Sequence, residues 1–258
     1  MQSRRKFAVT GATGRLGPHV VDALRREGHD VVPISRSNGV DVVTGEGLDE
    51  ALVGVEAIVD AATPPTPDQQ AAVEFFTAAA HNLQEAGERA GIGRIVIVSI
   101  IGIDRYTSGY QAGKIAQERS IQAGPVPARV ARAAQFHEFV DQLLEWTTQD
   151  GVAYLPRMRT QLVAAKAVGE ELAALIADPA AATGPIIEIA GPREENLAEA
   201  ARRLVTRRGD RLRIEEVYDP DDPLAVLYAN GANLPGPGAK LVGPTFDEWL
   251  GSEVSAAA

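Results

Sequence analysis

The chain has 258 residues, of which 45% are hydrophobic, and its 25 basic and 35 acidic side chains give a net charge of −10. This acidic balance without a Lys/Arg cluster argues against a nucleic-acid binder, the lack of cysteine excludes disulfides and thiolate chemistry, and no apolar run approaches the roughly 18 residues of a membrane span. With a polar start in place of a signal segment, we expect a cytoplasmic protein from a GC-rich bacterial genome, with a small molecule as partner and no nucleic acid or membrane.

The first expected element is a strand over Phe7–Val9 that runs into a glycine-rich turn and then an amphipathic helix. Gly11 permits the tight turn, while Gly14 lets a phosphate approach the backbone and Gly17 lets the helix pack against the strand. The N–H groups at the helix start would then bind an anion. This pattern predicts a dinucleotide site, with a ligand-free strand–turn–helix as the alternative; the expected contacts are Gly11, Thr13, Gly14, Arg15 and Leu16.

A second strand is expected over Asp30–Ser35, and its end is basic where an NAD-binding fold normally carries an acid. A guanidinium at Arg36, flanked by the hydroxyls of Ser35 and Ser37, suits a ribose 2′-phosphate. Arg15 in the glycine loop is a second candidate for the same phosphate. The cofactor predicted from these residues is NADP(H), preferred over NAD(H), unless both arginines are simple surface residues.

Two further strand ends are expected to line the cofactor site. A short third strand is predicted over Val40–Val43, where Asp41 is a candidate adenine contact. A buried strand over Ala57–Ala61 runs into the rigid PPTP loop at residues 64–67, which cannot be helical. Because ligands bind at the carboxyl ends of strands in such sheets, the expected cofactor contacts at this end are Ala61, Ala62 and Thr63. Asp68 or Thr66 then caps a long helix.

A third group of polar residues follows the apolar strand predicted over Ile95–Ser99, a pattern typical of a central parallel strand. Ser99 emerges at its carboxyl end, and a Gly-rich loop leads on to a helix. Tyr110 and Lys114 are four residues apart, so their side chains share one face of that helix. These three residues are the catalytic candidates.

The C-terminal half is expected to alternate strands and helices less regularly. A strand over Ala128–Arg132 precedes a helix that runs from Gln135 to about Gln149, and Phe136 and His137 at its start are the candidate substrate contacts; a polar helix start is the alternative for His137. Further expected elements are a loop or edge strand at 155–158, a helix around 168–176, a strand at 186–189, a helix capped by Asn196 and a short last helix at 246–250.

Other chemistries find no support in the sequence. The four histidines, His19, His29, His81 and His137, lack the spacing of metal ligands, so we expect no metal. No GxSxG element indicates a hydrolase.

The motifs together resemble a known superfamily. Thr10–Gly17 resembles the TGxxGxxG loop of the short-chain dehydrogenase/reductases, and Tyr110–Lys114 resembles their YxxxK pair. The PPTP loop, the SIIGIDRY stretch and the QFHEF segment resemble the atypical, NmrA-like NAD(P)-binding branch. The resemblance covers roughly residues 5–250. It implies an α/β fold, a doubly wound parallel (Rossmann) sheet in one domain, with a small C-terminal substrate lobe from about residue 152 to residue 258.

The resemblance also implies an activity, an NADPH-dependent oxidoreductase that reduces a carbonyl, quinone or enone-type small molecule by hydride transfer. Tyr110 would donate the proton, while Lys114 would lower the pKa of Tyr110 and hold the nicotinamide ribose. The family usually places its Ser or Thr just after the strand, so Thr107 and Ser108 are alternatives to Ser99.

Two rival functions share the fold. One is a non-catalytic NADP(H)-sensing regulator, and the other is a nucleotide-sugar epimerase or dehydratase. The intact Tyr110 and Lys114 favour an enzyme. The sequence leaves open the substrate, the direction of the reaction and whether the protein is a monomer or a homodimer.

Overall fold

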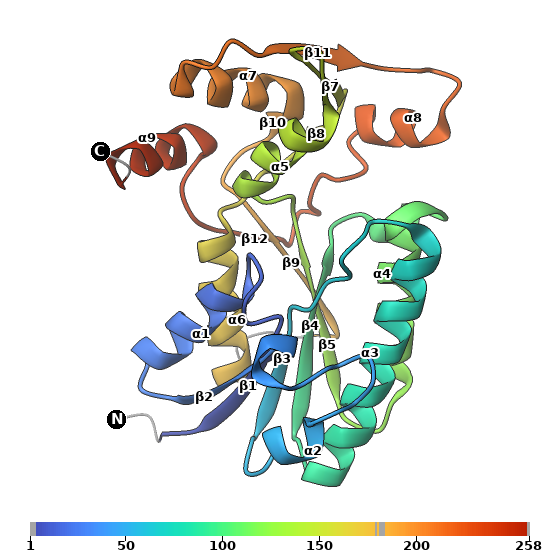
Figure 1. Cartoon of the computed structure of the whole chain (residues 1–258), viewed down its shortest axis with the longest axis vertical. Coiled ribbons are helices and arrows are strands. Elements are labelled where there is room, and N and C mark those ends of the chain that lie inside the picture. Colours follow the sequence, from blue (N-terminus) through green and yellow to red (C-terminus); the bar gives the residue numbers. More distant parts are fainter. Residues whose placement is uncertain (1–3, 179, 181–183, 257–258) are drawn as a thin grey trace. The chain divides into compact units, whose positions relative to one another are not determined.

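The chain forms two compact units in the computed structural model, which describes residues 4–178, 180 and 184–256 (Figure 1). The first unit comprises Met1–Ser99, Tyr106–Arg132 and Gly169–Ile187, and the second comprises Ile100–Arg105, Ala133–Val168 and Glu188–Ala258. Each unit has its own hydrophobic core. In the part of the chain that the structure describes, no helix is long and apolar enough to cross a membrane.

The central sheet has seven strands in the order β12-β9-β5-β4-β3-β1-β2. The ladders β1–β2, β1–β3, β3–β4 and β9–β12 are parallel. This confirms the predicted Rossmann-like α/β fold. The strands are β1 (Lys6–Thr10), β2 (Asp30–Ile34), β3 (Ala57–Asp60), β4 (Arg94–Ile100), β5 (Ala128–Ala133), β9 (Ile186–Ala190) and β12 (Lys240–Leu241).

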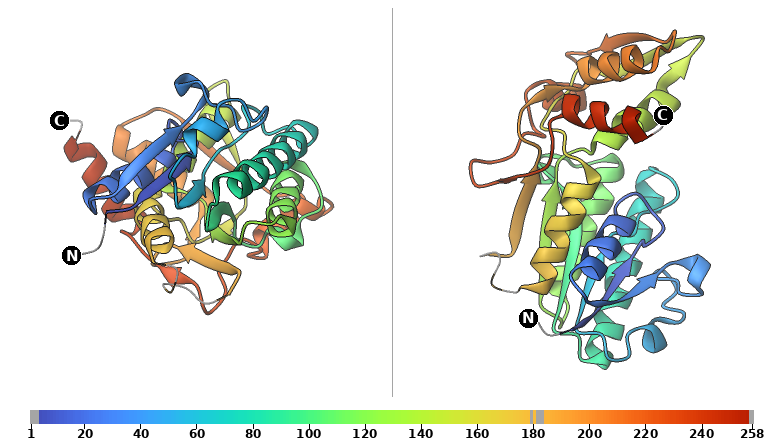
Figure 2. Two further views of the ribbon diagram at one scale, coloured as in Figure 1. Left: turned by 90° about the horizontal axis from the view of Figure 1, so that it is seen from below. Right: turned by 90° about the vertical axis from the view of Figure 1, so that its left-hand side faces the viewer.

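Helices cover both faces of this sheet (Figure 2). α1 and α6 lie on one side and α3 and α4 on the other. Their apolar stripes are buried, as at Phe76 and Leu83 of α3. Asp68 caps α3 by accepting a hydrogen bond from the Ala71 N–H at 2.9 Å, as predicted. The helices are α1 (Gly17–Arg26), α2 (Leu48–Ala51), α3 (Gln69–Ala90), α4 (Gly109–Ala123) and α6 (Ala165–Ala177), with short 3₁₀ turns at Arg36–Asn38 and Ile103–Arg105.

The strand predicted over Val40–Val43 is wrong, because this segment forms a tight turn instead. The carboxylate of Asp41 accepts a hydrogen bond from the Val43 N–H at 2.7 Å, and the Asp41 N–H donates to the Glu46 carbonyl at 3.0 Å. Just beyond the segment, Gly45 and Gly47 have φ angles of +79° and +74°, in the left-handed region that turns use. A short Asp side chain that bonds its own backbone two residues on favours a turn over a strand.

The second unit is built around α5 (His137–Thr147), α7 (Leu197–Arg208) and a small sheet in the order β11-β7-β6. α5 ends two residues before the predicted Gln149, because Thr148 and Gln149 form β6. Asn196 caps α7 as predicted, and the expected last helix is α9. The remaining elements are β6 (Thr148–Gln149), β7 (Val152–Pro156), β8 (Arg159–Thr160), β10 (Glu195–Asn196), β11 (Arg213–Val217), α8 (Pro223–Ala229) and α9 (Phe246–Ala256). The predicted substrate lobe, from about residue 152, falls in this unit except for Gly169–Ile187.

Candidate functional site

The glycine loop joins β1 to α1 in the first unit, and two of its glycines are required by packing. Gly11 has a φ of +62°, and a Cβ there would lie 2.5 Å from the carbonyl oxygen of Ala61. A Cβ on Gly17 would lie 2.1 Å from the carbonyl oxygen of Gly11. Real Cβ atoms essentially never approach so closely, so both positions need glycine for the fold itself.

Gly14 is different, because packing alone explains it less well. It is exposed, as are Thr13 and Arg15, and a Cβ would meet only the Gly11 carbonyl oxygen, at 3.2 Å. The loop therefore presents open backbone beside the start of α1, where the helix dipole favours an anion. Leu16 is buried and offers only its backbone. This arrangement fits the pyrophosphate of a dinucleotide.

The end of β2 lies beside this loop. The Ala12 N–H donates to the carbonyl of Ile34, the last residue of β2, at 3.3 Å. Arg36 follows in an exposed 3₁₀ turn and has no ion pair among the described residues. The hydroxyls of Ser35 and Ser37 are 2.8 Å apart. An exposed guanidinium with two neighbouring hydroxyls fits the predicted contact with a 2′-phosphate.

The end of β3 meets the same loop from the other side. The Ala61 carbonyl lies against Gly11, Ala62 is buried and Thr63 is exposed. The structure thus brings the ends of β1, β2 and β3 together in one unit. Asp41 uses one carboxylate oxygen to hold its turn, and its adenine contact stays a prediction.

Tyr110 and Lys114 share one face of α4, as predicted, and both contact the ring of Phe76 on α3. The rings of Tyr110 and Phe76 meet edge to face with centroids 5.6 Å apart. Lys114 Nζ lies 4.1 Å from the centroid of the Phe76 ring, at cation–π distance. Nζ also donates to the Val98 carbonyl at 2.8 Å and to Gln117 Oε1 at 2.9 Å.

The charges around this pair differ from the expectation. The pKa of Tyr110 lies above its ordinary value, because burial disfavours the phenolate and the nearby Asp60 repels it. The predicted lowering of the Tyr110 pKa by Lys114 is therefore wrong: the ammonium is bonded to Val98 and Gln117, while burial, and then the Asp60 charge, raises the pKa of the phenol. Burial also lowers the pKa of Lys114 to about 8, although Asp60 and Glu118 favour its charged form.

Ser99 is the second-last residue of β4, one residue after the carbonyl that anchors Lys114. Its side chain is buried, and its Oγ has no hydrogen-bond partner among the described residues. A buried hydroxyl without a partner is costly unless something bonds it. The alternatives, Thr107 and Ser108, are both exposed. The orphaned Oγ fits a polar group of a bound ligand.

The candidate substrate contacts lie in the second unit. Phe136 is half-buried at the start of α5. His137 is fully buried, its Nε2 is 3.2 Å from the Pro244 carbonyl, and its ring packs against Phe246 and Trp249 of α9. These contacts make His137 a packing residue of this unit; substrate roles for Phe136 and His137 stay predictions.

Asp60, Gln117 and Phe76 are residues that the sequence analysis did not assign to the site. Gln117 Nε2 donates to Asp60 Oδ2 at 2.7 Å, and Thr10 Oγ1 donates to Asp60 Oδ1. An acid at the end of an otherwise apolar strand was the available signal for Asp60. The other two lie on amphipathic helices, where nothing local separates them from ordinary core positions.

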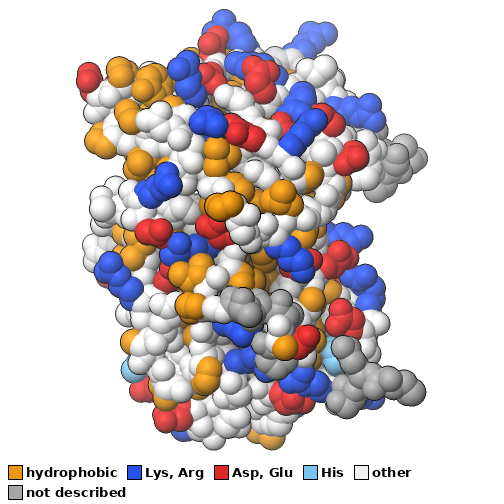
Figure 3. Space-filling model, turned by 180° about the vertical axis from the view of Figure 1, so that it is seen from behind, with side chains coloured by type: hydrophobic (Ala, Val, Ile, Leu, Met, Phe, Trp, Pro, Cys, Tyr) orange, Lys and Arg blue, Asp and Glu red, His pale blue; other side chains and the backbone are white. Residues whose placement is uncertain are grey.

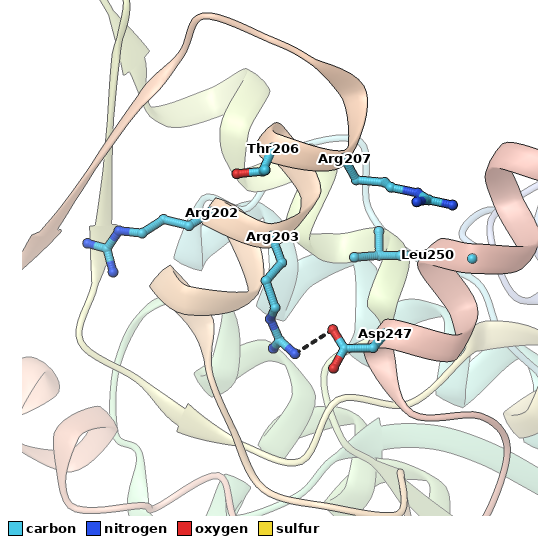
Figure 4. A pocket seen from close by; sticks show the side chains of 7 residues that line it. Arg202, Arg203, Thr206, Arg207, Asp247 and Leu250 are labelled. Atoms are coloured by element: carbon cyan, nitrogen blue, oxygen red, sulfur yellow. Dashed lines mark hydrogen bonds and ion pairs between the residues drawn. The ribbon is translucent and has the colours of Figure 1, made fainter.

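The second unit also contains a hollow of about 420 Å³ between α7 and α9 (Figure 4). Its walls are formed by Arg202, Arg203, Thr206, Arg207, Asp247, Leu250 and Gly251. Arg203 donates to Asp247 at 2.8 Å across it. None of the predicted site residues lines this hollow.

Comparison with known proteins finds a matching family model and several relatives. A family model described as NAD(P)H-binding matches residues 11–148. A ceramide reductase of Caulobacter vibrioides is 30% identical over 148 residues, which are 50% of this chain and 46% of that protein. A chloroplastic divinyl chlorophyllide a 8-vinyl-reductase of Oryza sativa subsp. indica is 29% identical over 226 residues, 74% of this chain and 55% of that protein. The chain thus spans about half the length of these relatives.

Solved structures share the fold at lower identity. A short-chain dehydrogenase/reductase superfamily protein of Agrobacterium tumefaciens with bound NAD has a TM-score of 0.68 at 17% identity, over 98% of this chain and 97% of that one. An NADPH-dependent quinone oxidoreductase of Escherichia coli has a TM-score of 0.65 at 17% identity, over 96% and 99% of the two chains. At this identity the likenesses show a shared fold, and together with the NAD(P)H-binding family match they are consistent with the predicted resemblance to atypical short-chain dehydrogenase/reductases.

Proposed function

Because the chain belongs to the NAD(P)H-binding family, we propose that it is an NADPH-dependent oxidoreductase that reduces a carbonyl, quinone or enone-type small molecule. The observation that carries the proposal is that one unit holds Tyr110, Lys114, the glycine loop and the Ser99 hydroxyl, which has no partner in the described part of the chain. Two relatives with reductase names and a quinone oxidoreductase among the structural neighbours support it.

The residues that would hold the cofactor lie at the ends of β1, β2 and β3. The loop around Gly14 would take the pyrophosphate on backbone N–H groups, and Arg36 would pair with the 2′-phosphate. Ala61–Thr63 would line the site beside the loop. The cofactor, when bound, supplies a hydride.

The chain's own catalytic work is to deliver a proton and to stabilise negative charge on the acceptor oxygen. Tyr110 suits the proton donor, because its raised pKa keeps the phenol protonated at neutral pH. A protonated phenol serves reduction better than the reverse reaction, which needs a phenolate. The Ser99 hydroxyl would donate to the same oxygen, and the Lys114 ammonium would hold the ribose and supply positive charge.

A non-catalytic NADP(H) sensor is the second candidate function. One observation favours it: Lys114 Nζ is committed to Val98 and Gln117, and no described contact links it to Tyr110. A sensor would bind the dinucleotide and leave Tyr110 without a chemical role.

The experiment that separates these functions measures NADPH oxidation at 340 nm with a panel of quinones, enones and ketones, next to NADPH binding by fluorescence. If the protein is an oxidoreductase, we expect turnover with at least one acceptor class and loss of turnover in Tyr110→Phe. Tight NADPH binding without turnover across the panel would favour the sensor. Absence of NADPH binding would contradict both.

A further inference from the structure

Four buried polar side chains of the first unit, Thr10, Asp60, Gln117 and Lys114, form one continuous chain of hydrogen bonds that runs from β1 to α4. Thr10 and Gln117 both donate to the carboxylate of Asp60, Gln117 Nε2 at 2.7 Å from Oδ2, and the Ala62 N–H donates to Oδ1 at 3.1 Å. At its other end, the Gln117 amide accepts from Lys114 Nζ at 2.9 Å. Asp60 is 1% exposed, Gln117 is 0% exposed and Lys114 is 5% exposed.

The two ends of this chain of hydrogen bonds fix the orientation of the Gln117 amide between them. A carboxylate only accepts and an ammonium only donates, so the Gln117 amide must turn its NH₂ to Asp60 and its oxygen to Lys114. The amide thereby places an acceptor at a defined point for Nζ. The Val98 carbonyl is the second acceptor, 2.8 Å from Nζ.

Lys114 needs these hydrogen bonds because its ammonium is buried. An ammonium removed from water is costly unless it is paired and hydrogen-bonded. The charged groups that act on it are Asp60, at the end of β3, and Glu118, on its own helix. Glu118 is already paired with Arg132 through two hydrogen bonds of 3.0 and 2.8 Å, so Asp60 is the carboxylate whose hydrogen bonds lead to Lys114.

We propose that Gln117 and Asp60 are positioning residues for Lys114, which fix its ammonium at the end of β4 and hold it in the charged form. This role in the reaction rests on the proposed function. The physical link between the three residues does not, because it is measurable without substrate or cofactor. A bound ribose would then meet an ammonium already oriented by the protein, with one N–H left beyond the two bonded to Val98 and Gln117.

The test uses the small number of lysines. The chain has four, Lys6, Lys114, Lys166 and Lys240, and Lys114 is the one that is buried. Lysine labelled with ¹³C at Cε therefore gives four NMR signals, of which the three from Lys6, Lys166 and Lys240 serve as internal references. Loss of one signal in Lys114→Arg assigns the fourth.

The decisive variants are Gln117→Met and Asp60→Asn, with Gln84→Met as the matched control. Gln84 is a second buried amide of the same unit, 3% exposed, whose Nε2 donates to the carbonyls of Ile121 and Val126. Gln117→Met and Asp60→Asn should each lower the midpoint of the Lys114 signal by about one pH unit. Gln84→Met should leave it unchanged at a comparable loss of stability.

A second experiment measures whether Gln117 also affects the pH dependence of turnover through Lys114. In the acceptor assay, the basic limb of the kcat/KM profile should move down by about one pH unit in Gln117→Met and stay in place in Gln84→Met. If the Lys114 midpoint is the same in the parent protein, Gln117→Met and Asp60→Asn, the proposal is overturned. If the protein oxidises NADPH with none of the acceptors tested, the proposed function is rejected. The NMR comparison still decides whether Gln117 and Asp60 act on Lys114.

Discussion

At the scale of single residues, Tyr110 and Lys114 illustrate how surroundings change a familiar pair. Both residues touch the Phe76 ring, yet the phenol faces the charge of Asp60 while the ammonium is bonded elsewhere. Burial therefore moves the two pKa values in opposite directions, each toward the neutral side chain. This arrangement keeps the Tyr110 phenol protonated, as its proposed role as proton donor requires, and holds the Lys114 ammonium at neighbouring acceptors.

Replacement of Tyr110 by Phe removes the donor while the ring contact with Phe76 is retained. We expect turnover to fall by roughly 10²–10⁴-fold, because general acid catalysis contributes about that much, with NADPH affinity nearly unchanged. Steady-state kinetics and a fluorescence titration of NADPH check both parts. A fully active Tyr110→Phe protein would rule Tyr110 out as the acid.

Arg36 tests the choice of cofactor. Arg36→Ala should weaken NADPH binding by roughly 10–100-fold, since a charge-assisted contact is worth about 1.5–3 kcal/mol, and should leave NADH binding unchanged. Fluorescence titrations of both cofactors measure this. Equal affinity of the parent protein for NADPH and NADH would count against the assignment.

The burial of His137 lets us predict how the stability of the protein changes at low pH. Burial lowers its pKa to about 4, whereas the unfolded chain has a value near 6.5. The unfolded state thus binds the extra proton first, so stability is lost as the pH falls from about 6.5 to about 4. Urea unfolding at several pH values should show this loss, and it should be smaller in His137→Gln, which cannot titrate. An equal acid response of both proteins would contradict the argument.

At the scale of elements, the glycine loop separates two uses of glycine. Gly11 and Gly17 are required by contacts between β1, α1 and β3, whereas Gly14 lies on the open side of the loop. Substitutions at these positions should therefore affect different properties.

Gly17→Ala and Gly14→Ala form a matched pair for this comparison. Gly17→Ala should cost about 1–3 kcal/mol or more of stability, because its Cβ overlaps the Gly11 carbonyl and the backbone must shift. Gly14→Ala should unfold near the parent temperature but bind NADPH at least about tenfold more weakly, since the added methyl group blocks the approach of a phosphate. Thermal unfolding and NADPH titration of both variants decide. Unchanged NADPH binding in Gly14→Ala would remove the loop from the binding site.

At the scale of the whole molecule, the two units differ in the binding roles that we expect for them. All proposed cofactor contacts and the catalytic candidates fall in the first unit, and both candidate substrate contacts fall in the second. On the face drawn in Figure 3, basic and acidic side chains are interspersed, so this face carries no single-sign patch of the kind that nucleic acid requires.

Hydrogen exchange should locate the cofactor in one of the two units. Saturating NADPH should slow exchange in peptides that cover residues 10–17, 35–41 and 60–63, because binding stabilises the state that holds the ligand. Peptides from α7 and β11 serve as the internal control and should change little. Protection confined to α7 and α9 would place the ligand in the hollow of the second unit and contradict the proposed site.

Features whose signals lie within a few residues of one another could be predicted from the sequence alone. The strand, the spaced glycines and the helix of residues 7–26 are one local pattern, and so is the pair Tyr110–Lys114 on one helical face. Caps at Asp68 and Asn196 were predictable for the same reason, since a side chain three residues away supplies the bond.

The polar contacts between distant segments, by contrast, form only when the chain folds. Asp60, at the end of β3, is connected by hydrogen bonds through Gln117 to Lys114 on α4. The spacing of these residues along the sequence does not predict that contact. β7 pairs with β11, which comes from a remote part of the chain, so its partner could not be found from alternation alone. His137 is polar and starts a helix, yet Phe246 and Trp249 of α9 bury it. Burial and pKa depend on neighbours brought in by folding, which is why the local pattern placed the candidate pair on one helical face but did not predict its electrostatics.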